Sequence, residues 1–226
     1  MLSAWDLRQG SRCGERLRRR FNGSTGQFIT GARHTVLARL RGDIALAHTE
    51  MRAATPTDFP EPVDLLPEQV RLYNAASRGY LTMFGNEHAK ALDWERSREL
   101  PDLGVHFKAT PGIMFECTDT SRQLRRIQAS GRVPNIDQSA LYSLAILWED
   151  NLRGTTIEVV AADVVAMELQ SVELHVDDVI EDAHLWFAAR VQELRSIAHE
   201  AKVVTGNECA DCQYVWDCPA HRSARR

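Results

Sequence analysis

The sequence predicts an α/β protein in which helices surround a central mixed sheet. Three observations favour this class: apolar residues at helical spacing early in the chain, short strand-like runs in its middle, and a helix, two strand runs and a long helix in its second half. The chain has 226 residues, 44% hydrophobic and 26% charged, which argues against a disordered or fibrous protein. It contains no apolar run of about 18 residues, and Met1–Asp6 lacks the pattern of a secretory signal. We therefore expect a cytoplasmic protein with reduced thiols and no membrane partner.

Helices are predicted for three early segments. Ser3 can cap a first helix that is rich in arginine and ends at the glycine-containing break 22–26. A second helix is expected from about Gly31 to Met51. Four prolines make residues 54–67 a loop, and Pro67 then opens a third helix.

Strands dominate the next part of the chain, where turn residues separate short apolar runs. The expected strands are Ala89–Trp94, Val105–Lys108, Ile113–Cys117 and Leu124–Ile127. A helix over Ile136–Asn151, strand runs at Thr156–Ala162 and Val164–Leu174, and a helix over Asp177–Val204 follow. We divide the chain into a basic helical segment (1–53), a core (54–204) and a cysteine-rich tail (205–226).

Charge is distributed unevenly along the chain. Residues 1–52 carry ten Arg and four acids, a local charge of +6, so the remainder carries −10. Only three of the 27 basic residues are Lys, and Arg is the better partner for bidentate phosphate contacts. A genome that prefers Arg codons explains the ratio equally well, but it does not explain the clustering. The basic segment therefore predicts an acidic partner.

Three of the five cysteines lie in the tail, as Cys209-x2-Cys212-x5-Cys218. An odd cysteine count in a reducing compartment favours metal or redox chemistry over disulfides. Two sets of ligands are chemically sensible. His221 would complete a local zinc site, whereas Cys13 would complete a four-cysteine site for an iron–sulfur cluster and join the two ends of the chain.

The second ligand set resembles a known family. A lone Cys in an arginine-rich helix with a C-terminal C-x2-C-x5-C resembles the 4Fe-4S staple of RecB-like nucleases in the PD-(D/E)XK superfamily, including CRISPR-associated and AddB-type members. Gly31-Ala32-Arg33-His34 resembles its Gly–His motif, and Gln138-Ser139-Ala140-Leu141-Tyr142 resembles its Q-x3-Y motif. The resemblance implies a restriction-endonuclease-like core, with Cys13, Cys209, Cys212 and Cys218 as cluster ligands. We expect Cys117, in a strand, to be a small buried hydrophobe.

The catalytic strands depart from the family pattern. Hydrolysis of a phosphodiester requires clustered carboxylates for Mg²⁺ or Mn²⁺ and a nearby Lys. The best register of the strands Gly112–Glu116 and Leu124–Gly131 places Arg126 at the position of the acid and Gln128 at that of the Lys. We therefore expect an impaired nuclease, with a vestigial site of His34, Glu116, Gln138 and Tyr142.

DNA is the expected partner, including single strands, together with a protein partner in a DNA-processing or defence complex. The residues assigned to DNA contacts are Arg12, Arg16, Arg19, Arg20, Arg125, Arg126 and Gln128, near other arginines at 8, 18 and 122. An alternative for the strand arginines is that Arg125 and Arg126 lie on opposite faces of the sheet, one in solvent and one paired with an acid such as Glu116.

Two other functions remain open. The first is an active Mg²⁺- or Mn²⁺-dependent nuclease with a migrated site made of His34, Asp102 or Asp119, and Glu116. The second is a zinc-knuckle interaction module, in which the basic N-terminal segment docks on an acidic protein.

Overall fold

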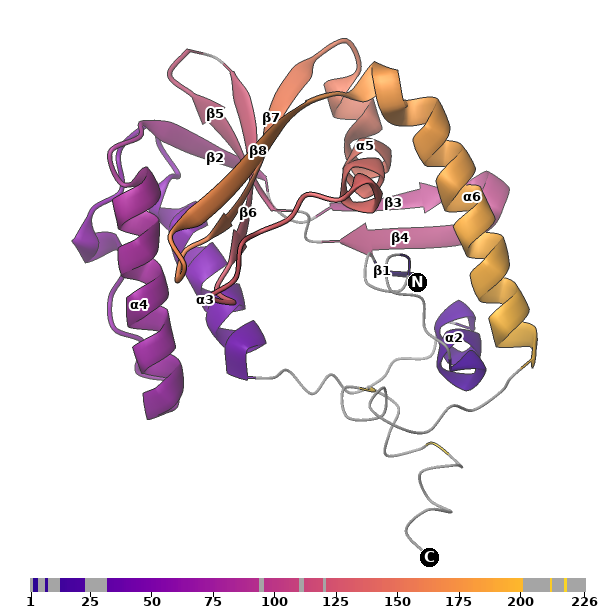
Figure 1. Cartoon of the computed structure of the whole chain (residues 1–226), viewed down its shortest axis with the longest axis horizontal. Coiled ribbons are helices and arrows are strands. Elements are labelled where there is room, and N and C mark those ends of the chain that lie inside the picture. The colour runs from indigo at the N-terminus through magenta and orange to yellow at the C-terminus, as the bar shows by residue number, and fades with distance from the viewer. Residues whose placement is uncertain are drawn as a thin grey trace, which may run out of the picture.

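The computed structural model describes residues 2–3, 7, 13–22, 32–93, 96–109, 112–119, 121–200, 212 and 218. The chain forms a mixed sheet of five strands and a second, smaller sheet of three strands. Figure 1 shows helices on both faces of the larger sheet. The predicted class, a mixed sheet flanked by helices, is confirmed. Within these described residues, no helix is both long and apolar enough to cross a membrane.

The larger sheet has the strand order β2-β5-β6-β7-β8. Its neighbours are antiparallel except for β6 and β7, which are parallel and are connected through α5 (Gln138–Leu152). The strands are β2 (Ala89–Asp93), β5 (Ile113–Cys117), β6 (Arg122–Gln128), β7 (Thr156–Asp163) and β8 (Glu168–His175). A helical crossover is the usual connection between parallel strands, because a short turn cannot reverse the chain twice.

Helices α3 (Ala32–Ala47) and α4 (Pro67–Phe84) cover one face of this sheet, here called the α4 face. The other face, the α5 face, packs against α5 and α6 (Val176–Glu200). Side chains alternate between the faces along each strand. The α4 face buries Ile113, Phe115, Ile127 and Val160, and the α5 face buries Met114, Leu124 and Val159. Although α3 belongs to the basic segment defined from the sequence, it therefore packs into the core.

The smaller sheet joins the start of the chain to its middle. Its order is β1-β4-β3, formed by β1 (Leu2–Ser3), β4 (Val105–Ala109) and β3 (Arg96–Leu100). Ser3 therefore lies in a strand, and the prediction that it caps a helix is wrong. Leu2 is buried and pairs with Phe107, whose ring meets Phe187 of α6 edge-on at 4.9 Å. Burial of Leu2 against this pair stabilises the extended backbone there.

The helix α2 (Gly14–Phe21) packs against α6, and Figure 1 shows it beside the C-terminal end of that helix. Arg195 of α6 lies over the ring of Phe21, 5.6 Å from its centroid. Two short 3-10 helices, η1 (Pro56–Asp58) and η2 (Pro101–Leu103), complete the elements. The first and last described helices are thus neighbours.

A buried carboxylate connects the smaller sheet to α5 and α6. Glu149 of α5 accepts hydrogen bonds from Arg98 of β3 at 2.8 Å, from His184 of α6 at 2.9 Å and from Arg153. Burial acts to raise the pKa of Glu149, but the bonds from Arg153 and His184 outweigh it and hold the pKa below its usual range. Glu149 is therefore ionised at neutral pH and stabilises the contact between three elements.

Candidate functional site

Arg126 and Gln128 lie on the α5 face of β6, as their alternation with Ile127 requires. Gly112, just before β5, lies against Arg126. A Cβ atom at Gly112 would lie 2.5 Å from the backbone oxygen of Arg125 and 3.2 Å from Cγ of Arg126. Only glycine permits this close approach, so the stem of Arg126 crosses a position that has no side chain.

Small residues flank Arg126 on both sides. Its register partner on β7 is Ala161, whose own partner on β8 is Gln170. Register partners point to the same face of a sheet, so Gly112, Arg126, Ala161 and Gln170 form one row across the α5 face, which we call the Arg126 row. With Gly112 and Ala161 on either side, the long side chain of Arg126 is the bulkiest group in the middle of this row.

The first turn of α5 lies on the same face, close to the row. The backbone N–H of Ile136 donates to Oε1 of Gln170 at 2.8 Å, and the side chain of Asp137 caps the helix by accepting from the N–H of Ala140 at 2.7 Å. Gln170 is two strands from Arg126, which is about 10 Å. The positive end of the α5 dipole and the guanidinium of Arg126 therefore favour an anion in the same region.

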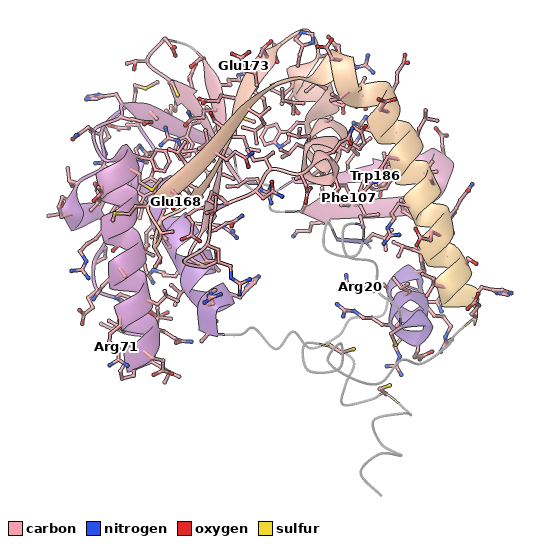
Figure 2. All side chains as sticks on the ribbon, in the orientation of Figure 1. Arg20, Arg71, Phe107, Glu168, Glu173 and Trp186 are labelled. Atoms are coloured by element: carbon pink, nitrogen blue, oxygen red, sulfur yellow. The ribbon has the colours of Figure 1, made fainter. Side chains whose placement is uncertain are left out.

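Gln138 and Tyr142 are joined to each other at the start of α5. Nε2 of Gln138 donates to the hydroxyl oxygen of Tyr142 at 2.6 Å, across one helical turn. Tyr142 is buried, and its ring lies 5.9 Å from that of Trp186, which Figure 2 labels on α6. Gln138 is exposed. The pair thus fixes an exposed amide at the end of α5 that lies near the Arg126 row.

Gln128, at the end of β6, is the register partner of Asp163 on β7. Asp163 is fully buried and accepts five hydrogen bonds, from the N–H and hydroxyl of Ser130 and from the N–H groups of Gly131, Val165 and Ala166. Burial acts to raise the pKa of Asp163, but these bonds lower it to about 2. Sequence reasoning missed this residue. Its signal is an acid that ends the apolar strand β7.

Arg125 lies on the α4 face, and its side chain is completely buried. Its guanidinium carbon lies 4.5 Å from the ring centroids of both Phe84 and Phe115, and it donates to Gln123 and Glu87. The alternative that Arg125 and Arg126 lie on opposite faces is therefore right. The assignment of Arg125 to DNA is corrected, because aromatic rings enclose the group and its acidic partner is Glu87, not Glu116.

A buried His–Tyr pair lies beside Arg125. Nδ1 of His48 lies 3.0 Å from the backbone oxygen of Ala89, and Nε2 lies 3.0 Å from the hydroxyl oxygen of Tyr80. Burial lowers the pKa of His48 and raises that of Tyr80 to about 12. A carbonyl can only accept, so Nδ1 of the neutral ring carries the hydrogen and Nε2 accepts from Tyr80. The geometry makes this a satisfied structural pair.

Glu116 lies far from the Arg126 row. Its register partners are Lys90 on β2 and Arg122 on β6, so it stands between two cations. Arg122 is four positions from Arg126 on β6, which corresponds to about 13 Å, and six positions from Gln128, which corresponds to about 20 Å. Glu116 therefore lies at the opposite end of β6 from Arg126 and Gln128, whereas Gln138 is the member of the expected vestigial site that lies near the Arg126 row.

The migrated nuclease site is not assembled either. His34 is exposed in the first turn of α3, and Asp102 is exposed in η2, beside the smaller sheet. Asp119 accepts from the N–H and hydroxyl of Ser121 in the turn after β5. In the part of the chain that the structure describes, no three His, Cys, Asp or Glu side chains form a group that could hold a metal ion.

The arginines of α2 that we assigned to DNA contacts do not all face solvent in the part of the chain that the structure describes. Arg16 and Arg20, one turn apart, are only 7% and 8% exposed. Arg19 donates to Glu15 at 2.8 Å, and Arg18 does so as well. Arg12 and Arg8 lie outside the described residues. Two of the assigned side chains are therefore turned inwards, and a third shares an acid on its own helix.

The four proposed cluster ligands are described only in part. Cys13 is buried at the residue that precedes α2, Cys212 and Cys218 are half-buried, and Cys209 and His221 lie outside the described residues. The cysteines that are described form no disulfide and belong to no metal-binding group. The structure thus does not assemble the site from the residues it describes. Cys117 is half-buried on β5, and burial raises the pKa of its thiol.

Comparison with known proteins identifies no family. No protein-family model matches the chain, and no curated protein matches it. Among solved structures, one described as the crystal structure of SSO0001 is 13% identical and aligns over 97% of this chain and 86% of its own, with a TM-score of 0.38. Similarity at that level supports no conclusion about family or function.

Proposed function

We propose that this chain is a nuclease-fold protein with an impaired hydrolytic centre, that it binds DNA at the Arg126 row, and that it acts as a subunit of a DNA-processing or defence complex. One observation carries the proposal: Arg126 stands between Gly112 and Ala161, near the positive end of α5. A guanidinium can hold a phosphate through two parallel hydrogen bonds, and a helix N-terminus favours the same charge. The exposed amide of Gln138 adds a neutral donor.

Binding without hydrolysis follows from the charges of the same residues. A catalytic Mg²⁺ or Mn²⁺ needs carboxylate oxygens, and a guanidinium among them would repel the ion. Asp163, the acid paired in register with Gln128, already accepts five hydrogen bonds. Arg126 and Gln128 therefore suit a direct contact with a phosphodiester rather than its cleavage.

The test measures fluorescence anisotropy of labelled single- and double-stranded DNA over a range of salt concentrations. We expect affinity to fall steeply with salt, and Arg126→Gln to weaken binding and to reduce the salt slope by about one. The matched control is Arg71→Gln, which removes an exposed arginine that Figure 2 labels on α4. This helix covers the α4 face, whereas Arg126 lies on the α5 face. Equal losses in both variants, or binding that is indifferent to salt, would contradict the proposal.

The same preparation separates binding from cleavage. Incubated with Mn²⁺, DNA should remain intact over hours. Cleavage that disappears in Glu116→Ala would instead support an active nuclease with a migrated site. A circular dichroism spectrum of each variant establishes that it is folded.

We further propose that Cys13, Cys209, Cys212 and Cys218 hold a 4Fe-4S cluster. The packing of α2, which begins next to Cys13, against α6, whose end precedes the tail, supports this pairing of the two ends of the chain. Protein purified without oxygen should be brown, and Cys13→Ser should bleach it, whereas Cys117→Ser should not. A colourless protein that contains stoichiometric zinc would favour the His221 site instead.

A further inference from the structure

The strand β8 leaves one edge of the larger sheet open. It is the last strand in the order β2-β5-β6-β7-β8 and is hydrogen-bonded to β7 alone among the described strands. Figure 1 shows it running the full height of the sheet. Residues 168–171 and Glu173 are exposed. An open edge presents unpaired N–H and C=O groups, which are a template for another extended chain.

This edge lies in the most acidic part of the sequence. Residues 154–189 contain eight acids and no Lys or Arg, a formal charge of −8. The exposed acids of this region are Glu168, Glu173, Asp177, Asp178, Glu181 and Asp182. Figure 2 labels Glu168 towards one end of β8 and Glu173 towards the other. The open edge is therefore bordered by negative charge along its length.

Apolar side chains are exposed at the turn that leads into β8. Met167 and Leu169 are 59% and 54% exposed, and Val165 is also exposed. The turn is held in place, because Asp163 accepts from two of its N–H groups. Gly79 of α4 also abuts it: a Cβ atom there would lie 1.7 Å from the backbone oxygen of Val164. The exposed apolar side chains of this turn thus lie directly beside the acidic open edge of β8.

We propose that the open edge of β8 receives an extended basic segment of a protein partner, which adds a strand to the sheet. Backbone hydrogen bonds would supply affinity, and Glu168 and Glu173 would select basic side chains. DNA is excluded from this surface by its charge. This is the contact that the proposed role as a subunit requires, and the inference rests on that role.

A second copy of this chain fits the edge less well. Two β8 strands that pair antiparallel about Ser171 would place Glu173 opposite Leu169 and bring two surfaces of −8 together. Like charges across such an interface oppose association. The acids thus disfavour self-pairing while leaving the edge available to a basic strand.

The positions of the acids define the spacing expected in the partner. Glu173 points to the α4 face, with its register partner Glu158, whereas Glu168 points to the α5 face, with Asp163. They are five residues apart, an odd spacing that puts them on opposite faces. A strand that meets both needs two basic residues five positions apart, with apolar or β-branched residues between them.

The test uses two labelled peptides of eight residues, the length of β8. Both contain two Arg among Val and Thr, five positions apart in one and four in the other. We expect tighter binding of the first, and about a tenfold loss with the double variant Glu168→Lys and Glu173→Lys. The matched control, Glu99→Lys with Asp102→Lys, changes the net charge equally at exposed sites of the smaller sheet and η2. It should retain most of the affinity.

Hydrogen exchange supplies a readout that charge alone does not affect. Bound peptide should slow exchange of the amides of β8, and unchanged exchange there would overturn strand addition. Equal losses in the two double variants, or a dimer that the β8 variant abolishes in sedimentation, would also overturn the proposal. DNA anisotropy on the same proteins keeps the two ideas apart, because loss of peptide binding should leave DNA binding intact.

Discussion

Replacement of Glu149 tests whether the buried carboxylate holds the smaller sheet to α5 and α6. Glu149→Gln keeps the shape of the side chain and removes its charge, so the bonds from Arg98, His184 and Arg153 all weaken. Its neighbour Asp150 also contacts Arg98, at 3.3 Å, but its side chain is 78% exposed. The two adjacent acids therefore form a matched pair that differs in burial.

The expected magnitude follows from the exposure of each partner. A hydrogen bond between charged groups contributes about 1.5–3 kcal/mol when it is buried, which applies to Arg98, whereas the more exposed Arg153 and His184 contribute less than about 1 kcal/mol each. Glu149→Gln should thus reduce the free energy of unfolding by about 3 kcal/mol and lower Tm by about 6–12 °C. Asp150→Asn should change it by less than about 0.5 kcal/mol.

Urea denaturation followed by circular dichroism measures both variants. The low pKa of Glu149 means that its stabilisation is complete above the ordinary carboxyl pKa and is lost as pH falls below it. The difference in the free energy of unfolding between wild type and Glu149→Gln should therefore become smaller as the pH falls from 6 to about 3. The reasoning would be refuted if Asp150→Asn lost as much free energy of unfolding as Glu149→Gln, or if the difference between wild type and Glu149→Gln did not depend on pH.

Three further predictions concern the sheet and its faces. Gly112→Ala should destabilise the protein by about 2 kcal/mol or more, because the added Cβ would collide with backbone atoms. Gly42→Ala should instead stabilise α3 by about 0.5–1 kcal/mol, because no atom lies within 4 Å of the added Cβ. Urea denaturation of both variants compares the two effects. Tyr80→Phe should cost about 1–2 kcal/mol, because it leaves Nε2 of buried His48 without a donor; an unchanged urea midpoint would contradict that pairing. Asp163→Asn should cost about 2 kcal/mol at pH 7 and reduce the loss of stability that wild type shows between about pH 4 and pH 2, measured by acid titration of the circular dichroism signal.

Much of the larger sheet can be predicted from the sequence, because its strands are apolar runs bounded by turn residues. The predicted strand Ile113–Cys117 has the bounds of β5. The strand β3 was missed, since Arg-Ser-Arg-Glu-Leu is polar and is stabilised by pairing with β4. Residues 164–167, predicted as strand, form the turn before β8, where Met167 has a φ of +56°. Apolar composition alone does not distinguish such a turn from a strand.

For the candidate site, the sequence predicts which types of residue take part, but not which of these residues lie together. That Arg126 lies half-buried on one face and Arg125 is enclosed on the other depends on the strand register and on Phe84, which comes from a different part of the chain. The proximity of Gly112 to Arg126, and of the start of α5 to Gln170, depends on contacts between segments that no local pattern encodes. Sequence spacing identifies candidates, whereas tertiary packing decides which of them meet.

The contacts that the first described residues make with β4 and α6 have a consequence for the order of folding. Arg190 of α6 donates to the backbone oxygen of Leu7 across 183 residues, and β1 pairs with β4. All five strands of the larger sheet, by contrast, lie within residues 89–175. Closing the longer loop carries the greater entropic cost, so we expect the larger sheet to form first. Pulse-labelled hydrogen exchange during refolding should therefore show protection of β6 and β7 before α2. During synthesis on a ribosome, Leu7 and α2 therefore cannot make their contacts with α6 until that helix has emerged.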